Sequence, residues 1–119
     1  MTETSAQDAA TRGMELLATG RAAEAVEAFR KAIAADPLHH EAHHGLVRAL
    51  RDAGLLEQSV GAAQALTALT PNDPLAHAAL SIALQHAGHV PEAEAAAARA
   101  RILEWKIQLQ SLPGEERSL

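Results

Sequence analysis

The residues of this chain with the clearest capacity for chemistry are its histidines, seven among 119 residues. His39, His40, His43 and His44 fall together near the expected start of one helix. His40 and His44 are four residues apart, which places two imidazoles on one helical face, where they could share a zinc or similar ion with Glu41 or His43. We prefer a simpler interpretation, in which these rings pack between helices or lie on the surface. On that interpretation the protein has no metal and no cofactor.

Catalytic chemistry finds no other candidate residues. The chain has no cysteine, which excludes disulfides, thiolate zinc sites and thiol catalysis. It contains no Gly-rich phosphate loop and no HExxH motif, and its carboxylates are scattered without a readable partner arrangement. Ser59 and Ser81 fall at packing positions inside expected helices, so neither resembles an exposed nucleophile. We therefore expect a protein that is not an enzyme.

The charge balance argues against a nucleic-acid or membrane partner. Ten basic residues against fifteen acidic ones give a formal net charge of −5, whereas nucleic-acid binders usually carry a basic face. No stretch of the sequence approaches the roughly 18 apolar residues of a membrane span. The first residues are polar and acidic, without the apolar run of a secretory signal. We expect a cytoplasmic protein.

The apolar composition indicates closely packed helices. Apolar residues make up 48% of the chain, but aromatic residues only 2%, namely Phe29 and Trp105. Alanine makes up almost a quarter of the chain; it is the best helix former and a very small packing residue. A core of alanine and leucine cannot fill the wide interior of a sandwich or barrel. The composition therefore predicts an all-α fold.

A repeat organises these helices. Gly20, Gly54 and Gly88 are spaced 34 residues apart, and a leucine stands four positions before each. A glycine between two apolar-periodic segments is typical of a helix that ends in a left-handed cap and turns. We therefore expect three repeats between two ends. The expected boundaries are an N-terminal tail at 1–5, repeats at 6–39, 40–73 and 74–107, and the end of an extended helix with a tail at 108–119.

Each repeat is expected to form two helices around its glycine. The last helix should be extended, because Trp105 stands where a closing proline would end the repeat. The expected helices are 5–19, 22–35, 39–53, 56–69, 74–87 and 90–110.

The period and the helix-turn-helix unit resemble the tetratricopeptide repeat family, whose pattern is W-x₂-L-G-x₂-Y, then A-x₃-F, then P. The first repeat carries this pattern most completely, at Gly13, Ala25, Phe29, Ala32 and Pro37. The resemblance covers the three 34-residue repeats. It implies an α-solenoid of three antiparallel helix-turn-helix repeats in a right-handed superhelix, with an inner groove that binds proteins.

In the family, the first helix of each repeat lines that groove. Carried over by position, the candidate partner-binding residues are Gln7, Thr11 and Met14 in repeat one, Glu41, His44, Arg48, Arg51 and Asp52 in repeat two, and Ile82, Gln85 and His86 in repeat three. The plain alternative is that Arg48, Arg51 and Asp52 form a solvated face held by pairs three or four residues apart.

One specialised version of the family clamps the C-terminal carboxylate of heat-shock chaperones with Lys, Asn and Arg side chains. The matching positions here hold Ala10, Met14, Gly45, Leu75 and Ala79, none of which can make a charge-assisted hydrogen bond. We therefore expect no such clamp.

The extended last helix carries Ile102, Trp105 and Leu109 at helical spacing. One interpretation is that this helix caps the solenoid and covers its last exposed face. The other is that the stripe is a surface for a homodimer or another partner.

Together these features predict a non-catalytic adaptor or scaffold that binds a partner peptide or helix in its groove. The alternatives are a self-assembling module joined through the last helix, a regulatory domain of a larger enzyme, and a weak histidine-based metal binder.

Overall fold

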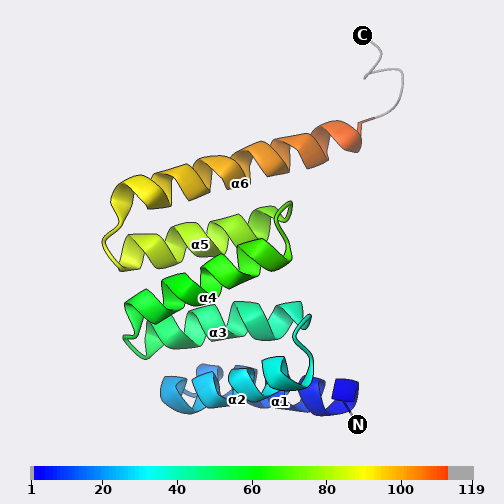
Figure 1. Cartoon of the computed structure of the whole chain (residues 1–119), viewed down its shortest axis with the longest axis vertical. Coiled ribbons are helices and arrows are strands. Elements are labelled where there is room, and N and C mark those ends of the chain that lie inside the picture. Colours follow the sequence, from blue (N-terminus) through cyan, green and yellow to red (C-terminus); the bar gives the residue numbers. More distant parts are fainter. Residues whose placement is uncertain (1, 113–119) are drawn as a thin grey trace.

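The computed structural model describes residues 2–112, and this part of the chain consists of six α-helices with no strand (Figure 1). The helices are α1 (Thr2–Ala18), α2 (Ala22–Ala35), α3 (His40–Asp52), α4 (Leu56–Leu69), α5 (Pro74–His86) and α6 (Val90–Gln110). The expected all-α solenoid, including its extended C-terminal helix of 21 residues, is confirmed.

The three glycines at 34-residue spacing close the three helix hairpins. Gly20, Gly54 and Gly88 adopt φ angles of +78°, +81° and +86°, a left-handed conformation that glycine adopts without a steric penalty. The amide of the residue after each glycine donates to the carbonyl of the leucine four positions before that glycine, as from Leu55 to Leu50 at 2.9 Å. This pattern terminates one helix and directs the chain into the next one.

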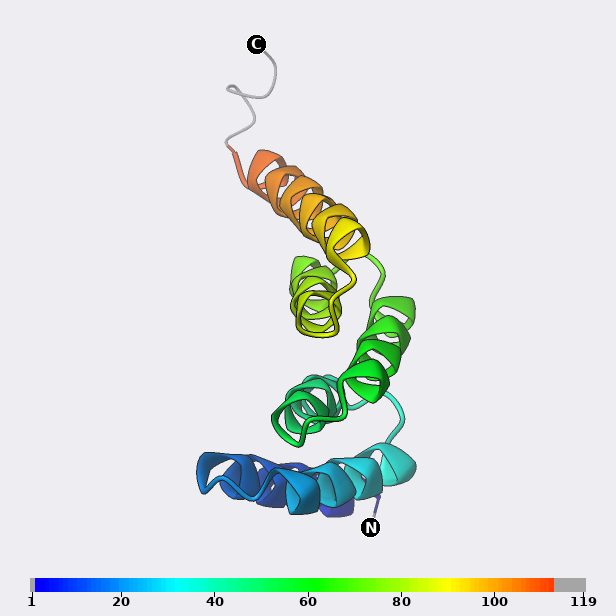
Figure 2. The same cartoon turned by 90° about the vertical axis from the view of Figure 1, so that its left-hand side faces the viewer.

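The hairpins stack in chain order, so each helix packs on its neighbours in sequence. The first helices of successive hairpins also touch, α1 with α3 and α3 with α5. Figure 2 shows α3 and α5 on one side of the stack and α4 on the other, with α6 running across the top of α5. We call the packing of α1–α2 against α3–α4 the first joint, and that of α3–α4 against α5–α6 the second joint.

Phe29 fills the centre of the first joint. Its side chain is fully buried and lies over two glycines, Gly13 on α1 and Gly45 on α3. A Cβ atom added at Gly13 would lie 2.7 Å from the Phe29 ring, and one at Gly45 would lie closer still. Ala25 and Ala32 on the same helix are also fully buried, where small side chains let the helices approach.

The second joint has a smaller aliphatic core, which includes Val47, Val60, Ala63 and Leu84. Ser59 is buried within it, and its hydroxyl donates to the Val47 carbonyl at 2.8 Å, joining α4 to α3.

The N-terminal boundary differs from the expectation. Helix α1 begins at Thr2, so residues 2–5 are helical where a tail over 1–5 was expected. Residues 2–5 contain no glycine or proline that would stop the helix. Helix α6 ends at Gln110 as expected, while the tail over residues 113–119 and residue 1 lie outside the described residues. No helix within residues 2–112 has the length and apolar content needed to cross a lipid bilayer.

Candidate partner-binding groove

A groove of about 350 Å³ lies between α3 and α5, and we call it the α3/α5 groove. Local helix geometry aligns its walls: His44, Arg48 and Arg51 follow one another at intervals of four and three residues along α3. The complete lining is His44, Val47, Arg48, Arg51, Leu75, Ala78, Ala79 and Ile82. Four of the residues expected from the sequence, His44, Arg48, Arg51 and Ile82, are therefore brought together.

The surface of the α3/α5 groove is mainly apolar. Val47 is almost fully buried in its wall, whereas Leu75 and Ile82 are 65% and 42% exposed. Ala78 and Ala79 leave room between these larger side chains. Large apolar side chains gathered at a concave surface are typical of a site for a ligand or partner.

Two arginines supply positive charge to this groove. Arg51 lies 3.9 Å from the carboxylate of the adjacent Asp52, measured from Nε to Oδ1, and Asp52 itself is not in the lining. Arg48 is exposed and forms no ion pair within the described residues. The pairs at spacings of three or four that would hold a solvated face are therefore not formed by these three residues.

His44 is a titratable residue of the groove whose pKa is shifted by its surroundings. Burial lowers the pKa of His44 below its usual value of 6.5. Asp73 opposes this by raising the pKa, while the nearby His40 and His43 lower it further. The imidazole is therefore biased toward its neutral form, in which it can both donate and accept a hydrogen bond.

The residues expected from repeat one lie outside the lining of this groove. Gln7 and Thr11 form a hydrogen bond of 3.3 Å along α1, and the Gln7 side-chain carbonyl also pairs with His39 Nε2 at 3.0 Å. Met14 is 39% exposed on the same helix. Gln7 thus belongs to the contact that closes α1 onto the start of α3.

Glu41, Gln85 and His86 also stand apart from the lining of the α3/α5 groove. Glu41 is exposed in the first turn of α3, and Gln85 faces a separate hollow with Ser81 and Val90. His86 Nδ1 bonds the Ile82 carbonyl at 2.9 Å, one turn back along α5.

The clustered histidines form hydrogen bonds with the backbone nearby in the chain. His39 caps α3, since its Nδ1 accepts the Ala42 amide at 3.1 Å. His43 and His77, which are 34 residues apart, each bond a proline carbonyl six residues upstream at 2.8 Å. Among the side chains of residues 5–112, no three from His, Asp or Glu converge as they would around a metal ion. His40 and His44 therefore lack a third ligand in the described structure.

Ser59 and Ser81 lie on opposite sides of the same contact in successive hairpins, because 34-residue spacing pairs Ser59 with Ala93 and Ser81 with Val47. The Ser59 hydroxyl donates to Val47, and the Ser81 hydroxyl donates to the Ala93 carbonyl at 2.7 Å. Both hydroxyls thus join the two helices of a hairpin, as the packing positions of these residues suggested.

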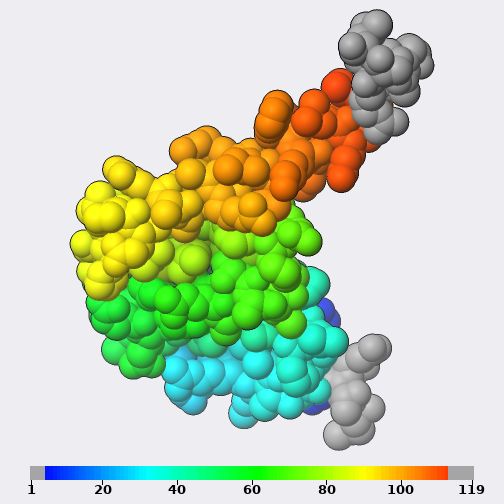
Figure 3. Space-filling view, turned by 45° about the horizontal axis from the view of Figure 1, so that its top comes forward, coloured from blue at the N-terminus to red at the C-terminus, as the bar shows by residue number. Residues whose placement is uncertain are grey.

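The stripe on α6 lies on the solvent side of that helix. Leu103 is buried, whereas Ile102, Trp105 and Leu109 are 45%, 61% and 40% exposed. The C-terminal half of α6 projects beyond the body of the stack (Figure 3).

Sequence reasoning missed two features of this region. Val47 occupies the family's glycine position, and the family pattern gave no reason to place it in a groove wall. A larger groove of about 680 Å³ between α4 and α6 was missed entirely. The sequence signal that could have revealed this groove is that residues 34 positions apart differ in type, at positions that the family pattern leaves unspecified.

Comparison with known proteins gives a consistent picture. A family model described as tetratricopeptide repeat matches residues 11–74, more than half of the chain. No curated protein matches the sequence.

Solved structures share the fold at low sequence identity. A crystal structure of MamA superposes with a TM-score of 0.80 at 21% identity, covering 89% of this chain and 62% of MamA. The type III secretion translocator chaperone SycD of Yersinia enterocolitica superposes with a TM-score of 0.77 at 15% identity. The superposition covers 84% of this chain and 76% of SycD. The second repeat domain of Spaghetti (RPAP3), bound to the HSP90 peptide SRMEEVD, gives 0.77 at 20% identity, with 85% and 94% covered. The chain thus spans about three fifths of the length of MamA.

Proposed function

Because the chain belongs to the tetratricopeptide repeat family, we propose that it is a non-catalytic protein-interaction module that binds a partner peptide or helix in the α3/α5 groove. The family supports protein binding in general, and the solved relative whose description names a bound HSP90 peptide supports binding of a peptide. The partner itself has to be inferred from the chemistry of the groove.

The observation that carries the proposal is the combination of exposed apolar side chains with a cationic wall. Leu75 and Ile82 offer apolar contact area, and Arg48 and Arg51 offer charge-assisted hydrogen bonds. A segment with apolar side chains and neighbouring carboxylates would match both surfaces.

A chaperone-tail clamp is not part of the proposal. Ala10 is fully buried, and Leu75 and Ala79 present only hydrocarbon to the groove. A C-terminal carboxylate would find no lysine or asparagine at these positions.

Peptide selection followed by charge reversal tests the proposal. Peptides selected from a displayed random library on the wild-type protein should combine apolar and acidic residues. The double variant Arg48→Glu/Arg51→Glu should weaken the selected peptides by about tenfold or more in calorimetry. The control Lys31→Glu/Arg99→Glu makes the same change in net charge at exposed positions outside the groove and should leave affinity nearly unchanged. Equal affinities for wild type and Arg48→Glu/Arg51→Glu would move the site elsewhere.

A second candidate function is self-association through α6. It is favoured by the three apolar side chains Ile102, Trp105 and Leu109, which line the face opposite the buried Leu103. Light scattering over a range of concentrations should then show a dimer that Trp105→Ser dissociates. A monomer at every concentration would reject this candidate.

A further inference from the structure

A second groove, of about 680 Å³, lies between α4 and α6 along α5. We call it the α4/α6 groove. Its lining comes from α4, α5, α6 and the residue before α6, whereas the α3/α5 groove is lined by α3 and α5 alone. Its lining is Glu57, Val60, Gly61, Gln64, His77, Leu80, Leu84, His89, Glu92, Ala95 and Ala96.

The floor of the α4/α6 groove is hydrocarbon. Val60 on α4 and Leu84 on α5 belong to the core of the second joint, and Leu80 packs partly buried against them. Ala95 and Ala96 continue this apolar surface along α6. An apolar stem laid along this floor would lose contact with water at little steric cost.

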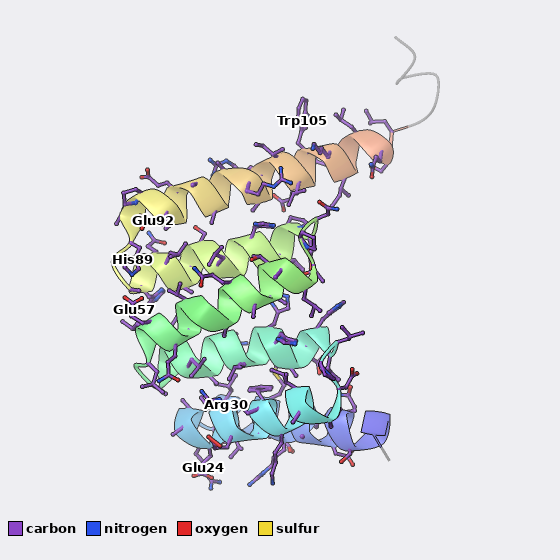
Figure 4. The ribbon with its side chains drawn as sticks, in the orientation of Figure 1. Glu24, Arg30, Glu57, His89, Glu92 and Trp105 are labelled. Atoms are coloured by element: carbon purple, nitrogen blue, oxygen red, sulfur yellow. The ribbon has the colours of Figure 1, made fainter. Side chains whose placement is uncertain are left out.

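The rim of the groove is acidic. Glu57 accepts hydrogen bonds from His89 Nε2, at 2.8 Å to Oε2 and 3.1 Å to Oε1. Glu92, on the first turn of α6, is exposed and forms no ion pair with the described side chains of residues 5–112. Figure 4 shows Glu57, His89 and Glu92 close together at one edge of the stack. The lining contains no lysine or arginine, so its charged carboxylates are not neutralised by a strong base of the chain.

The corresponding position of the first joint is bridged. There the Arg30 guanidinium on α2 donates to the Gln58 side-chain carbonyl on α4 at 3.1 Å. The residues 34 positions later are Gln64 and Glu92, both in the lining of the α4/α6 groove, and the bridge is not repeated.

A third difference between the two joints, besides those at Gln64 and Glu92, widens the groove. Glu27 at the first joint corresponds to Gly61 at the second joint. A Cβ atom at Gly61 would meet nothing within 4 Å, so the space beside it is open. The bridging cation is thus absent from the second joint, its acceptor has become a carboxylate, and a side chain has been removed beside it.

We propose that the α4/α6 groove binds a basic amphipathic segment of a partner protein. Apolar side chains and lysine or arginine stems of the segment lie over Val60, Leu80 and Leu84. Their cationic heads reach Glu57 and Glu92, in the place that Arg30 occupies at the first joint. The charge complementarity is reinforced by the net charge of −5.

The probe for this proposal is a synthetic helical peptide of leucine and lysine, compared with an analogue in which glutamate replaces lysine. In methyl NMR of the full chain, the lysine peptide should shift the signals of Val60, Leu80 and Leu84 with a Kd below about 100 µM. The glutamate analogue should leave these signals unshifted. Absence of binding by the lysine peptide, or shifts confined to Leu75 and Ile82 in the α3/α5 groove, would overturn the proposal.

The decisive variant introduces the bridge between Arg30 and Gln58 at the corresponding positions of the second joint. Gln64→Arg/Glu92→Gln should close the groove and weaken the lysine peptide by about tenfold or more. The control Ala68→Arg/Glu104→Gln makes the same change in net charge at exposed positions outside the groove and should weaken binding by no more than about twofold. An equal loss in both variants would mean that only net charge attracts the peptide, which contradicts the proposal.

Two further variants keep the test independent of folding and of the α3/α5 groove. The single exposed change Glu92→Lys should also weaken the peptide while leaving the methyl spectrum of the core unchanged. Arg48→Glu/Arg51→Glu should leave binding in the α4/α6 groove intact. Failure of either proposed site is therefore distinguishable from failure of the other.

Discussion

The two joints of the stack use corresponding positions of the repeat but fill them differently. At the first joint the ring of Phe29 lies over Gly13 and Gly45. At the second joint the positions 34 residues later hold Ala63, Val47 and Ala79. One large side chain in a glycine-lined space has been replaced by several small ones distributed over three helices.

The two joints also differ in the polar contacts between neighbouring hairpins. Gln7 pairs with His39 and Arg30 with Gln58 at the first joint, so polar bridges join neighbouring hairpins there. At the second joint the positions that correspond to Gln7 and His39 hold Glu41 and Asp73, two carboxylates that cannot donate to each other. The second joint is also the one with the α3/α5 groove and the α4/α6 groove. Glu57 and His89 do form a polar bridge between hairpins at the second joint, at the rim of the α4/α6 groove. The lesson is that the repeat pattern places the helices, while residues outside the pattern decide where a joint is bridged and where it is open.

The largest test of this comparison is removal of the Phe29 ring. Because the ring is fully buried between glycines that cannot fill the space, Phe29→Ala should lower the free energy of unfolding by about 3–5 kcal/mol. Ala63→Gly, at the corresponding position of the second joint, should cost only about 1 kcal/mol. Urea denaturation measures both, and equal losses would contradict the assignment of the main packing contact to the first joint.

A pair of glycine substitutions should give effects of opposite sign. In Gly45→Ala the new methyl group collides with the Phe29 ring and should destabilise the protein by about 1–3 kcal/mol. Gly61→Ala enters open space within helix α4 and should stabilise it by about 1 kcal/mol. Thermal melts would reveal the difference, and a stabilising Gly45→Ala would show that α2 and α3 can separate freely.

A polar bridge can also be transferred from the first joint to the second. Glu41→Gln with Asp73→His recreates the pair formed by Gln7 and His39, and the new histidine can keep capping its helix as His39 does. The double variant should be stabilised by about 0.5–1.5 kcal/mol, the usual net contribution of one hydrogen bond. Each single variant serves as a control in a double-mutant cycle, where a coupling energy of zero would mean that the bridge does not form.

The smallest expected effect is a pH dependence specific to the second joint. His44 has a pKa below its unfolded value of 6.5, so protonation favours the unfolded chain. Its contribution to stability is therefore fully present above pH 6.5 and decreases as the pH falls below 6.5. His44→Gln should lose less stability than the wild type on acidification. Urea titrations with the same slope against pH for both proteins would contradict the role of His44.

Much of the fold could be predicted from residue spacing. The hairpin turns could be predicted at Gly20, Gly54 and Gly88. A glycine in the left-handed conformation ends a helix through local backbone geometry, which does not depend on the rest of the fold. His44, Arg48 and Arg51 could be placed on one wall because spacing along a single helix decides which side chains share a face. The start of α1 was misplaced, because helix ends depend on weak local preferences.

The sequence by itself therefore determined the helices, their order and the faces that carry charge, since these follow from local backbone geometry and a repeated pattern. Only the tertiary structure decided where the grooves are. Gln7 meets His39, and Arg30 meets Gln58, across distances of 32 and 28 residues along the chain. Whether such pairs bridge a joint depends on the distance between side chains of different hairpins. Residue spacing within a single helix does not determine that distance.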